Sequence, residues 1–308
     1  MAFYCADPAM DQTLAALVAD LEREGRTGLA DQLSITWLRY GGSLRDRIGG
    51  LEADTFWSLP VQGAAWRPAV LRYPASVVKL VYLVAAEAWL QRRLLEDDPE
   101  LRRALAAMVR DSSNDATALV VDLLSGTTGG PDLPPERFAK WARQRRLVND
   151  WLEDLAWPEL EGCNACQKTW EDGPYGRERQ SYGEHLENRN RLSTDAVARL
   201  LHGVIAGAVV SPPACARMRS LLRRSLDPRA RAEDPENQVD GFLGGGLPEE
   251  ARLWSKAGWM SRARHDAAYV EADGSAPMLL VVFSEGEHCA RDERLLPQIA
   301  ARLFAWQP

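Results

Sequence analysis

The chain has 308 residues, and its apolar fraction of 46% and charged fraction of 26% are ordinary for a globular protein. This length allows one large domain or two lobes around a substantial core. The formal net charge of −7, without a block of basic residues, argues against a nucleic-acid partner, and no apolar run reaches the roughly 18 residues of a membrane-spanning helix.

Hydrophobic spacing and turn residues divide the chain into recognisable elements. The first is a helix over 11–24, and an alternating strand over 33–40 follows it. We expect no regular element over 52–72. Further helices are predicted over 77–95, 99–110, 115–124, 135–146, 194–207 and 212–224. A loop over 227–250 then leads to three strand-like runs and a closing helix, at 252–255, 267–271, 278–283 and about 290–305.

Ser76 and Lys79 stand at the start of the most apolar predicted helix. Pro74 favours an extended or turn approach, so the Ser76 hydroxyl is expected at a helix N-terminus, where free N–H groups favour negative charge. Lys79 follows one turn later, and an apolar setting lowers the proton affinity of its amine. The pair therefore has the chemistry of a serine nucleophile with a lysine base. The same spacing arises by chance about once in a chain of this length, and a lysine that snorkels to solvent explains it equally well.

Two polar triplets strengthen the catalytic interpretation. Residues 112–114 (Ser-Ser-Asn) directly precede a predicted helix, and residues 256–258 (Lys-Ala-Gly) end the first strand-like run. This order resembles the penicillin-recognising serine hydrolase superfamily, the serine β-lactamases and penicillin-binding proteins, whose pattern is S-x-x-K, S-D-N and K-T-G. The resemblance covers about residues 30–306. It is greatest to the class A β-lactamase-like branch, because residues 191–201 are similar to the helix start after that branch's omega loop.

The resemblance implies an α/β (α+β) fold of the β-lactamase/transpeptidase-like type. An antiparallel sheet flanked by helices would be built from residues 1–75 and 208–308. A helical lobe would be built from residues 76–207, with a long omega-like loop at 155–191. The substrate cleft would lie between the two lobes, a usual place for a small-molecule site.

The resemblance also implies a role for each motif residue. Ser76 would be the nucleophile and Lys79 its base. Lys256 would supply a second positive charge that keeps Lys79 neutral and attracts an anionic substrate. Ser112 would relay a proton to the leaving group, and Asn114 would hold Lys79 in place. Ser112 could instead be a helix N-cap, and the two uses are compatible if one serine caps while its neighbour faces the cleft.

The remaining site residues would contact the substrate. The backbone N–H groups of Ser76 and Trp259 would form the oxyanion hole, where one such donor is commonly worth about 3 kcal/mol of transition-state stabilisation. Other substrate contacts are expected from Asn114, Ala257, Gly258 and His265.

Two motif positions depart from the family pattern. Ser113 stands where aspartate is usual, and Ala257 replaces a threonine whose hydroxyl helps to hold the carboxylate of a β-lactam or peptide. A lost hydrogen bond to a charged group costs about 1.5–3 kcal/mol, so β-lactams are expected to be poor ligands. The interval between Ser76 and Ser112 is also shorter than is usual in class A enzymes, which indicates a trimmed helical lobe.

Deacylation needs a group that activates water, and in the class A branch an omega-loop glutamate does this. Glu178 lies at about the right distance before the next predicted helix, although a solvated loop carboxylate is the simpler explanation. Without such a base Lys79 would serve both half-reactions. Competing carboxylates are Glu171, Glu184 and Glu187.

Five cysteines, an odd number, suit a reducing compartment. Cys163 and Cys166 could be half of a zinc site, a loop disulfide or two ordinary thiols. The four histidines have no ligand spacing. We therefore predict no metal and no cofactor.

The first ten residues have neither the basic residue nor the apolar core of a secretory signal. A chain that begins at Met1 is therefore expected to be cytoplasmic, away from cell-wall substrates. The favoured function is a serine hydrolase that forms an acyl-enzyme with a small amide, peptide or ester. The first alternative is a true β-lactamase or D,D-peptidase, and the second is a catalytically silent member that binds a ligand or partner. The sequence leaves the oligomeric state open.

Overall fold

A computed structural model describes residues 3–45, 51, 53–170 and 172–307. Within these residues the centre is a seven-stranded sheet in the order β1-β3-β2-β7-β6-β5-β4. Neighbouring strands are antiparallel except β1 and β3, which run parallel, so the predicted antiparallel sheet is confirmed with that one exception. The strands are β1 (Cys5–Ala6), β2 (Leu33–Arg39), β3 (Gln62–Trp66), β4 (Arg223–Arg224), β5 (Arg252–Met260), β6 (Ala263–Glu271) and β7 (Met278–Glu285).

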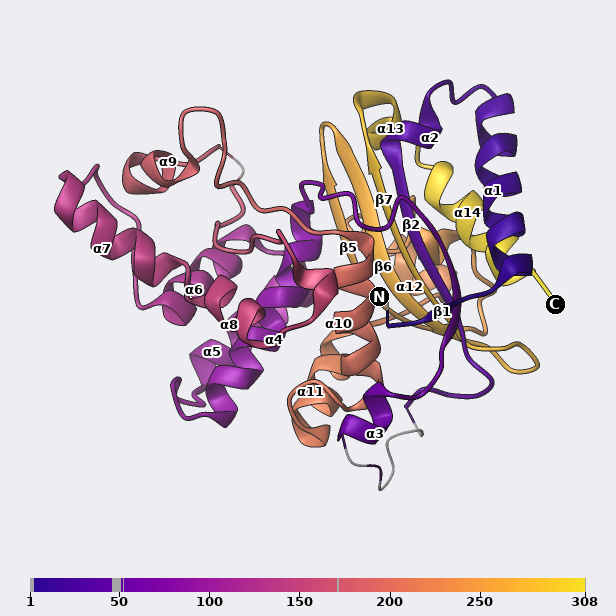
Figure 1. The fold of residues 1–308 in the computed structure, drawn as a ribbon, viewed down its shortest axis with the longest axis horizontal. Coiled ribbons are helices and arrows are strands. Elements are labelled where there is room, and N and C mark those ends of the chain that lie inside the picture. Colours follow the sequence, from indigo (N-terminus) through magenta and orange to yellow (C-terminus); the bar gives the residue numbers. More distant parts are fainter. Residues whose placement is uncertain (1–2, 46–50, 52, 171, 308) are drawn as a thin grey trace.

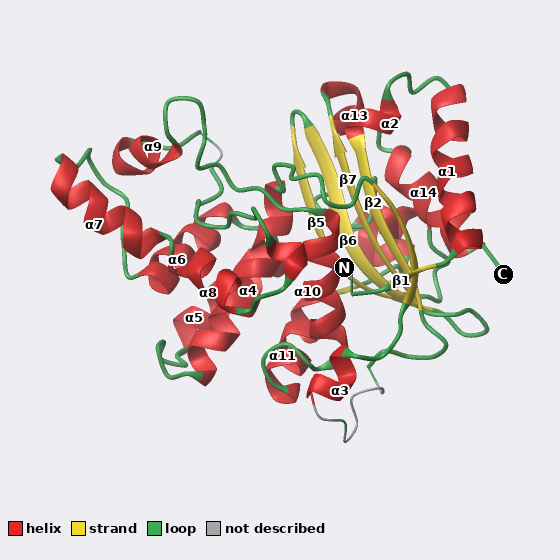
Figure 2. Ribbon diagram, viewed as in Figure 1, coloured by secondary structure: helices red, strands yellow, loops and turns green. Residues whose placement is uncertain are grey.

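Helices cover both faces of the sheet (Figures 1 and 2). On one face lie α1 (Pro8–Arg23) and α14 (Leu295–Phe304), which pack against β3 and β7 respectively. On the other face α10 (Thr194–Ala206) packs against β2, β6 and β7 and joins the sheet to the helical part. That part contains α4 (Val78–Gln91), α5 (Pro99–Arg110), α6 (Asn114–Ser125), α7 (Pro135–Arg145), α8 (Leu147–Asp154) and α9 (Gly176–Tyr182). We propose 1–75 with 208–308, and 76–207, as the division into lobes.

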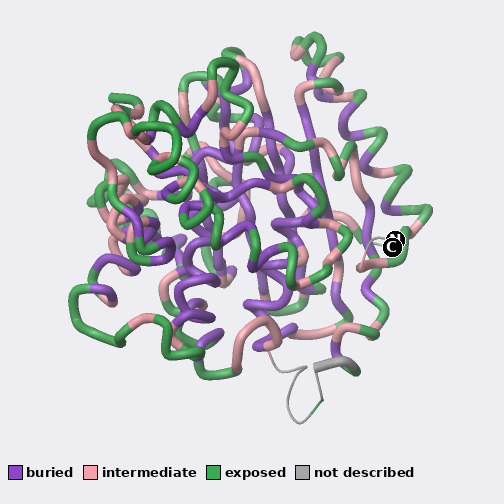
Figure 3. The backbone as a smooth tube through the Cα atoms, turned by 60° about the vertical axis from the view of Figure 1, so that its left-hand side comes forward, coloured by how far each residue is buried: buried purple, intermediate pink, exposed green. Residues whose placement is uncertain are grey.

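Strand side chains alternate between two cores, as the two-residue period of a strand requires. Along β7, one set faces the core shared with α4 and α10, and the other faces the core under α1 and α14. These sets are Leu279, Val281 and Phe283, and Met278, Leu280 and Val282. Figure 3 shows the result, in which buried backbone runs through the middle of the molecule and exposed segments lie outside.

The central helix is α4, which is buried from Val78 to Trp89. Two charged side chains lie within this buried stretch, Glu87 and Lys79. Glu87 is neutralised by Arg102 and Arg217, at 2.5 and 2.6 Å. A buried charge needs such partners, so the groups around Lys79 are expected to explain its position.

The N-terminal half contains elements that were not predicted. Residues 52–72, predicted to be irregular, include α3 (Ala53–Trp57) and β3. The small residues of β3 give no alternation of apolar and polar side chains. Gly63 is needed there because a Cβ would lie 2.9 Å from the carbonyl oxygen of Trp37.

The C-terminal elements differ from the prediction in their bounds. β5 extends through Met260, so the Lys-Ala-Gly triplet lies inside this strand and not at its end. The predicted loop over 227–250 contains α12 (Pro228–Ala232) and the 3-10 turn η3 (Leu243–Gly246). The closing helix is divided into α13 (Glu287–Arg291) and α14, and the helix predicted over 212–224 is α11 (Pro212–Leu222). No helix in the described part of the chain has the length and apolarity that a membrane crossing requires.

Candidate active site

Ser76 lies in a 3-10 turn, η1 (Ala75–Val77), directly before α4. The Val77 N–H closes this turn by donating to the carbonyl oxygen of Pro74 at 3.0 Å. Ala75 has a φ of 46°, a left-handed conformation that residues other than glycine rarely adopt. Such strain persists only where the surroundings enforce it, and it is frequent at functional sites. The half-buried Ser76 is therefore held at the entrance to the central helix.

Lys79 is fully buried in the first turn of α4. Its ammonium group donates to the Asn114 side-chain oxygen at 2.9 Å, to the Ser112 hydroxyl at 3.2 Å and to the Ser112 carbonyl oxygen. The contact predicted for Asn114 is present. These partners bring the first and second motifs together and fix the amine one turn from Ser76.

The two serines of the second triplet make different contacts. The Ser113 hydroxyl accepts the Ala116 N–H at 3.1 Å and so caps α6. Ser112 has a φ of 55°, again in the left-handed region, and its hydroxyl faces the two lysines. The cap of α6 and the hydroxyl that contacts the two lysines therefore belong to different residues.

Lys256 completes the cluster from the sheet side. Its ammonium group donates to the Ser112 hydroxyl at 3.0 Å and to the carbonyl oxygen of Ala257 at 2.7 Å. Burial, and then the positive charge of Lys79, hold the pKa of Lys256 well below its ordinary value. The Ser112 hydroxyl thus accepts hydrogen bonds from both lysines, which occupies its two lone pairs and leaves its own proton free to donate.

Gly258 brings β5 against η1, the turn that contains Ser76. A Cβ at this position would lie 2.8 Å from the Ser76 backbone nitrogen and 2.9 Å from both the Pro74 oxygen and the Val77 nitrogen. Only glycine allows two backbones to approach so closely. This contact places the end of β5, including Trp259, beside Ser76. The Trp259 indole is 58% exposed and donates to the carbonyl oxygen of Ala290 at 3.0 Å.

Gln238 is a site residue that the sequence did not reveal. Its side-chain oxygen accepts from the Lys256 ammonium group and from the Ala257 N–H, the latter at 3.3 Å. Its amide nitrogen donates to the carbonyl oxygens of Val109 and Arg110 at 3.2 and 2.7 Å. Ala257 itself is only 3% exposed, and Gln238 joins this part of β5 to the end of α5.

Asp266 lies opposite Ala257 on β6 and is also fully buried. One of its oxygens accepts the Leu243 N–H at 3.1 Å, and the other has no hydrogen-bond partner among the described residues. Burial raises its pKa to about 7, although Arg224 and Lys256 oppose this effect. No motif marks it, since a single aspartate within a strand carries no signal in the sequence.

Glu178 belongs to a buried charge cluster in the helical part of the molecule. It pairs with Arg145, and Lys168 lies 3.6 Å away; both cations also contact Asp122, at 3.1 and 2.7 Å. Figure 1 shows its helix, α9, at the outer end of the helical part, away from β5. This geometry gives Glu178 a structural explanation and does not support the role of water activator. Of its competitors, Glu184 and Glu187 are exposed and Glu171 lies outside the described residues.

His265 was predicted to contact the substrate, but its ring lies in the core. The ring is fully buried and stacks on the Phe283 ring, with 4.5 Å between the ring centres. Its Nδ1 accepts the Ser284 N–H at 3.0 Å, so Nε2 carries the proton and donates to the carbonyl oxygen of Tyr73 at 2.9 Å. Burial lowers the pKa of His265 to about 4, which keeps it neutral. This hydrogen bond anchors the segment before Ser76.

The cysteine pair lies apart from these groups. Cys163 and Cys166 are free thiols, and burial raises the pKa of both. The Cys166 sulfur lies 3.2 Å from the Asn164 side-chain oxygen. In the described residues no group of three or more His, Cys, Asp or Glu side chains could hold a metal ion.

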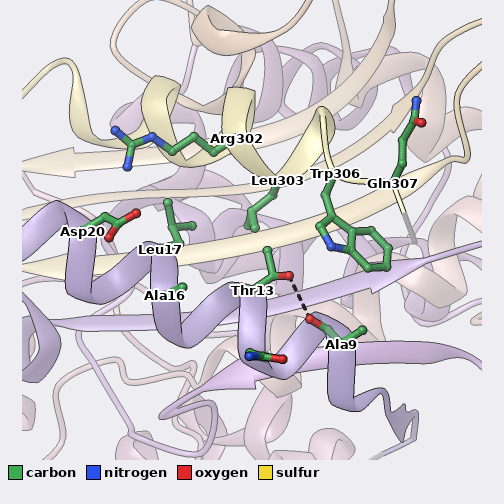
Figure 4. A pocket seen from close by; sticks show the side chains of 10 residues that line it. Ala9, Thr13, Ala16, Leu17, Asp20, Arg302, Leu303, Trp306 and Gln307 are labelled. Atoms are coloured by element: carbon green, nitrogen blue, oxygen red, sulfur yellow. Dashed lines mark hydrogen bonds between the residues drawn. The ribbon is translucent and has the colours of Figure 1, made fainter.

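A large surface groove lies on the other side of the sheet. It has a volume of about 490 Å³ and lies between α1 and α14. Figure 4 shows Leu17, Leu303 and Trp306 along it and Asp20 and Arg302 at its rim. The face of the sheet that it adjoins is the one opposite α10. The candidate chemistry therefore depends on the lysine and serine cluster and not on this groove.

The fold and the arrangement of these three motifs define a protein of the β-lactamase/transpeptidase-like class. A sequence profile described as the β-lactamase enzyme family matches residues 86–307. The chain belongs to this family. The match includes the second and third motifs and begins after Ser76 and Lys79.

Solved structures agree with this assignment of the fold. A β-lactamase from Sphaerobacter thermophilus is 16% identical with a TM-score of 0.61, and the match covers 95% of this chain and 94% of that chain. A β-lactamase from Xanthomonas campestris pv. campestris is 18% identical with a TM-score of 0.61 and covers 96% and 97%. PBP-A is 15% identical with a TM-score of 0.60 and covers 98% and 96%. A comparison with curated proteins found no match.

Proposed function

We propose that this protein is a serine hydrolase that forms an acyl-enzyme on Ser76 with a small amide, peptide or ester substrate. The observation that carries the proposal is the Ser112 hydroxyl, which accepts hydrogen bonds from Lys79 and Lys256 at 3.2 and 3.0 Å. A purely structural lysine does not need a second buried ammonium group beside it, because the two charges repel each other.

In the proposed mechanism, acylation begins with proton transfer from Ser76. Neutral Lys79 takes the proton from the Ser76 hydroxyl, and the oxygen attacks the substrate carbonyl carbon. The backbone N–H groups of Ser76 and Trp259 stabilise the oxyanion. As the bond to the leaving group breaks, Ser112 gives its proton to that group and receives one from Lys79, so the amine is neutral again.

Deacylation needs no further residue in this proposal. Lys79 removes a proton from a water molecule, which attacks the acyl carbon, and the proton returns to the Ser76 oxygen when the ester bond breaks. Glu178 is left out because Arg145 and Lys168 account for its position. An enzyme with one base for both half-reactions is expected to deacylate slowly.

A true β-lactamase or D,D-peptidase is the second candidate, and family membership favours it. Against it stands the end of the cleft at Ala257, where a hydroxyl is missing and Gln238 covers the backbone N–H. A catalytically silent binding protein is disfavoured because Ser76, Lys79 and Lys256 are all present in one cluster.

Intact-mass measurement after incubation with a fluorophosphonate, and separately with a penicillin, tests the proposal. We expect one fluorophosphonate adduct that Ser76→Ala abolishes with the melting temperature unchanged, and little penicillin adduct. An adduct that persists in Ser76→Ala would refute the nucleophile, and rapid penicillin turnover would establish the second candidate.

A further inference from the structure

Arg189 connects the two elements that hold the nucleophile. Its guanidinium carbon lies 3.7 Å from the centre of the Tyr73 ring, and its Nη2 is 3.7 Å from the sulfur of Met260. Tyr73 precedes Ser76 by three residues, and Met260 is the last residue of β5. Arg189 therefore lies beside the nucleophile turn at the end of β5 that is farther from Lys256.

The charge of Arg189 has no acidic partner in the described part of the chain. Arg145 and Arg199 each have a carboxylate within 4 Å, whereas no carboxylate of the described residues is that close to Arg189. A thioether is only a weak acceptor. The remaining nitrogens, Nε and Nη1, make no hydrogen bond within the described residues. They are not fully buried either, so both reach solvent. A guanidinium fixed on an aromatic ring, with two free donors, is well suited to bind a carboxylate.

The motifs give the cleft a direction. Lys256, Gly258 and Met260 share one face of β5, because strand side chains alternate, and Gly258 lies against Ser76. Ser112, the proposed proton donor to the leaving group, is bound at the Lys256 end. The leaving group thus lies toward Lys256, and the acyl group extends the other way, toward Met260 and Arg189.

We infer that the acyl group of the substrate ends in a carboxylate, which Arg189 binds. This inference rests on the proposed function and specifies its substrate class. Two residues of a strand span roughly 7 Å, which is the separation between Gly258 and Met260 along β5. A dicarboxylic acid chain of about five or six carbons has the length to reach from Ser76 to Arg189.

Two para-nitrophenyl esters test this inference directly. One is the ester of adipic acid with its distal carboxylate free, and the other has that carboxylate capped as a methyl ester. A charged hydrogen bond that is made only to the free acid should favour it in kcat/KM by roughly tenfold to a hundredfold. Arg189→Met should remove this preference, so that the kcat/KM values for the two esters come within about threefold of each other.

Two further variants separate charge from structure. Arg179→Met removes an exposed arginine of α9 and should retain the preference. Arg189→Lys keeps the charge without the planar donors and should retain part of the preference for the free acid. This variant also decides the outcome if Arg189→Met does not fold. Equal rates for the two esters, or a preference that survives in Arg189→Met, would overturn the inference.

Fluorophosphonate labelling of Ser76 distinguishes the two possible failures. Labelled protein that does not discriminate between the esters would refute the role of Arg189 and leave the proposed function in place. Protein that neither labels at Ser76 nor hydrolyses either ester would refute the proposed function, and the inference with it.

Discussion

Gly258→Ala should distort η1, the turn that contains Ser76, because residue 258 of β5 packs against it. The new Cβ would lie 2.8–2.9 Å from three backbone atoms of residues 74–77, at least half an ångström inside an ordinary contact of about 3.4 Å or more. Backbone atoms cannot rotate away as a side chain can, so β5 or the turn must move. The movement separates Ser76 from Trp259, whose N–H groups form the proposed oxyanion hole. The loss of one such donor costs about a hundredfold to a thousandfold in rate, and overpacking costs about 1–3 kcal/mol of stability.

The assay is the second-order rate of fluorophosphonate labelling at Ser76, measured beside the melting temperature. Gly42→Ala is the matched control, because a Cβ there has no heavy atom within 4 Å and the glycine does not have a positive φ. We expect the labelling rate of Gly258→Ala to fall at least a hundredfold while that of the control changes little. A folded Gly258→Ala protein that labels within about threefold of the unmodified rate would show that β5 does not contribute to the oxyanion hole.

Three further predictions concern charge and the closed end of the cleft. Lys256→Met removes a positive charge beside Lys79 and so favours protonation of Lys79. The pH at half-maximal fluorophosphonate labelling of Ser76 should therefore rise. An unchanged pH profile would show that the two amines are not coupled. Ala257→Thr alone should alter the rate of penicillin acylation less than threefold, because Gln238 still covers this end. The double variant of Ala257→Thr with Gln238→Ala should gain tenfold or more in that rate, measured by stopped-flow. A large gain from the single change would contradict this account of the end of the cleft. Although burial opposes it, hydrogen bonds from a neighbouring arginine and two hydroxyl groups hold the pKa of Glu271 at about 2, below its ordinary 4.5. The stability from Glu271 is thus present above about pH 4.5 and is lost as the pH falls toward 2, so Glu271→Gln should melt lower near neutral pH and lose less in acid than the unmodified protein.

The motif residues could be predicted because each belongs to a local pattern. Ser76 and Lys79 are one helical turn apart, and Ser112 and Asn114 flank the N-cap of α6. Their spacing in the sequence fixes their spacing in the structure. The order of the motifs then indicated a known fold, which the family match and the solved structures confirm.

The residues that were missed act through contacts between distant segments. Gln238 lies in a loop without a motif and reaches both β5 and the end of α5. Asp266 is set opposite Ala257 by the register of β5 and β6, which no local pattern specifies. His265 shows the converse error, because nearness to the cleft along a strand did not reveal that its ring points into the core. Strand register and loop closure are decided by tertiary packing, so a single sequence does not display them.

The two ends of the proposed cleft support our proposal that this protein acts on a substrate other than a β-lactam through a serine and lysine mechanism. At one end Gln238 occupies the hydrogen bonds of Lys256 and Ala257, which removes polar groups that a ligand could otherwise use. At the other end Arg189 presents donors without an acidic partner among the described residues. A binding site discriminates most strongly through polar groups that one ligand satisfies and another leaves unpaired. An anionic group on the acyl side would satisfy Arg189, whereas an anionic group on the leaving-group side would have to displace Gln238. The serine and lysine cluster does not depend on this choice, which is why the nucleophile and the substrate can be tested separately.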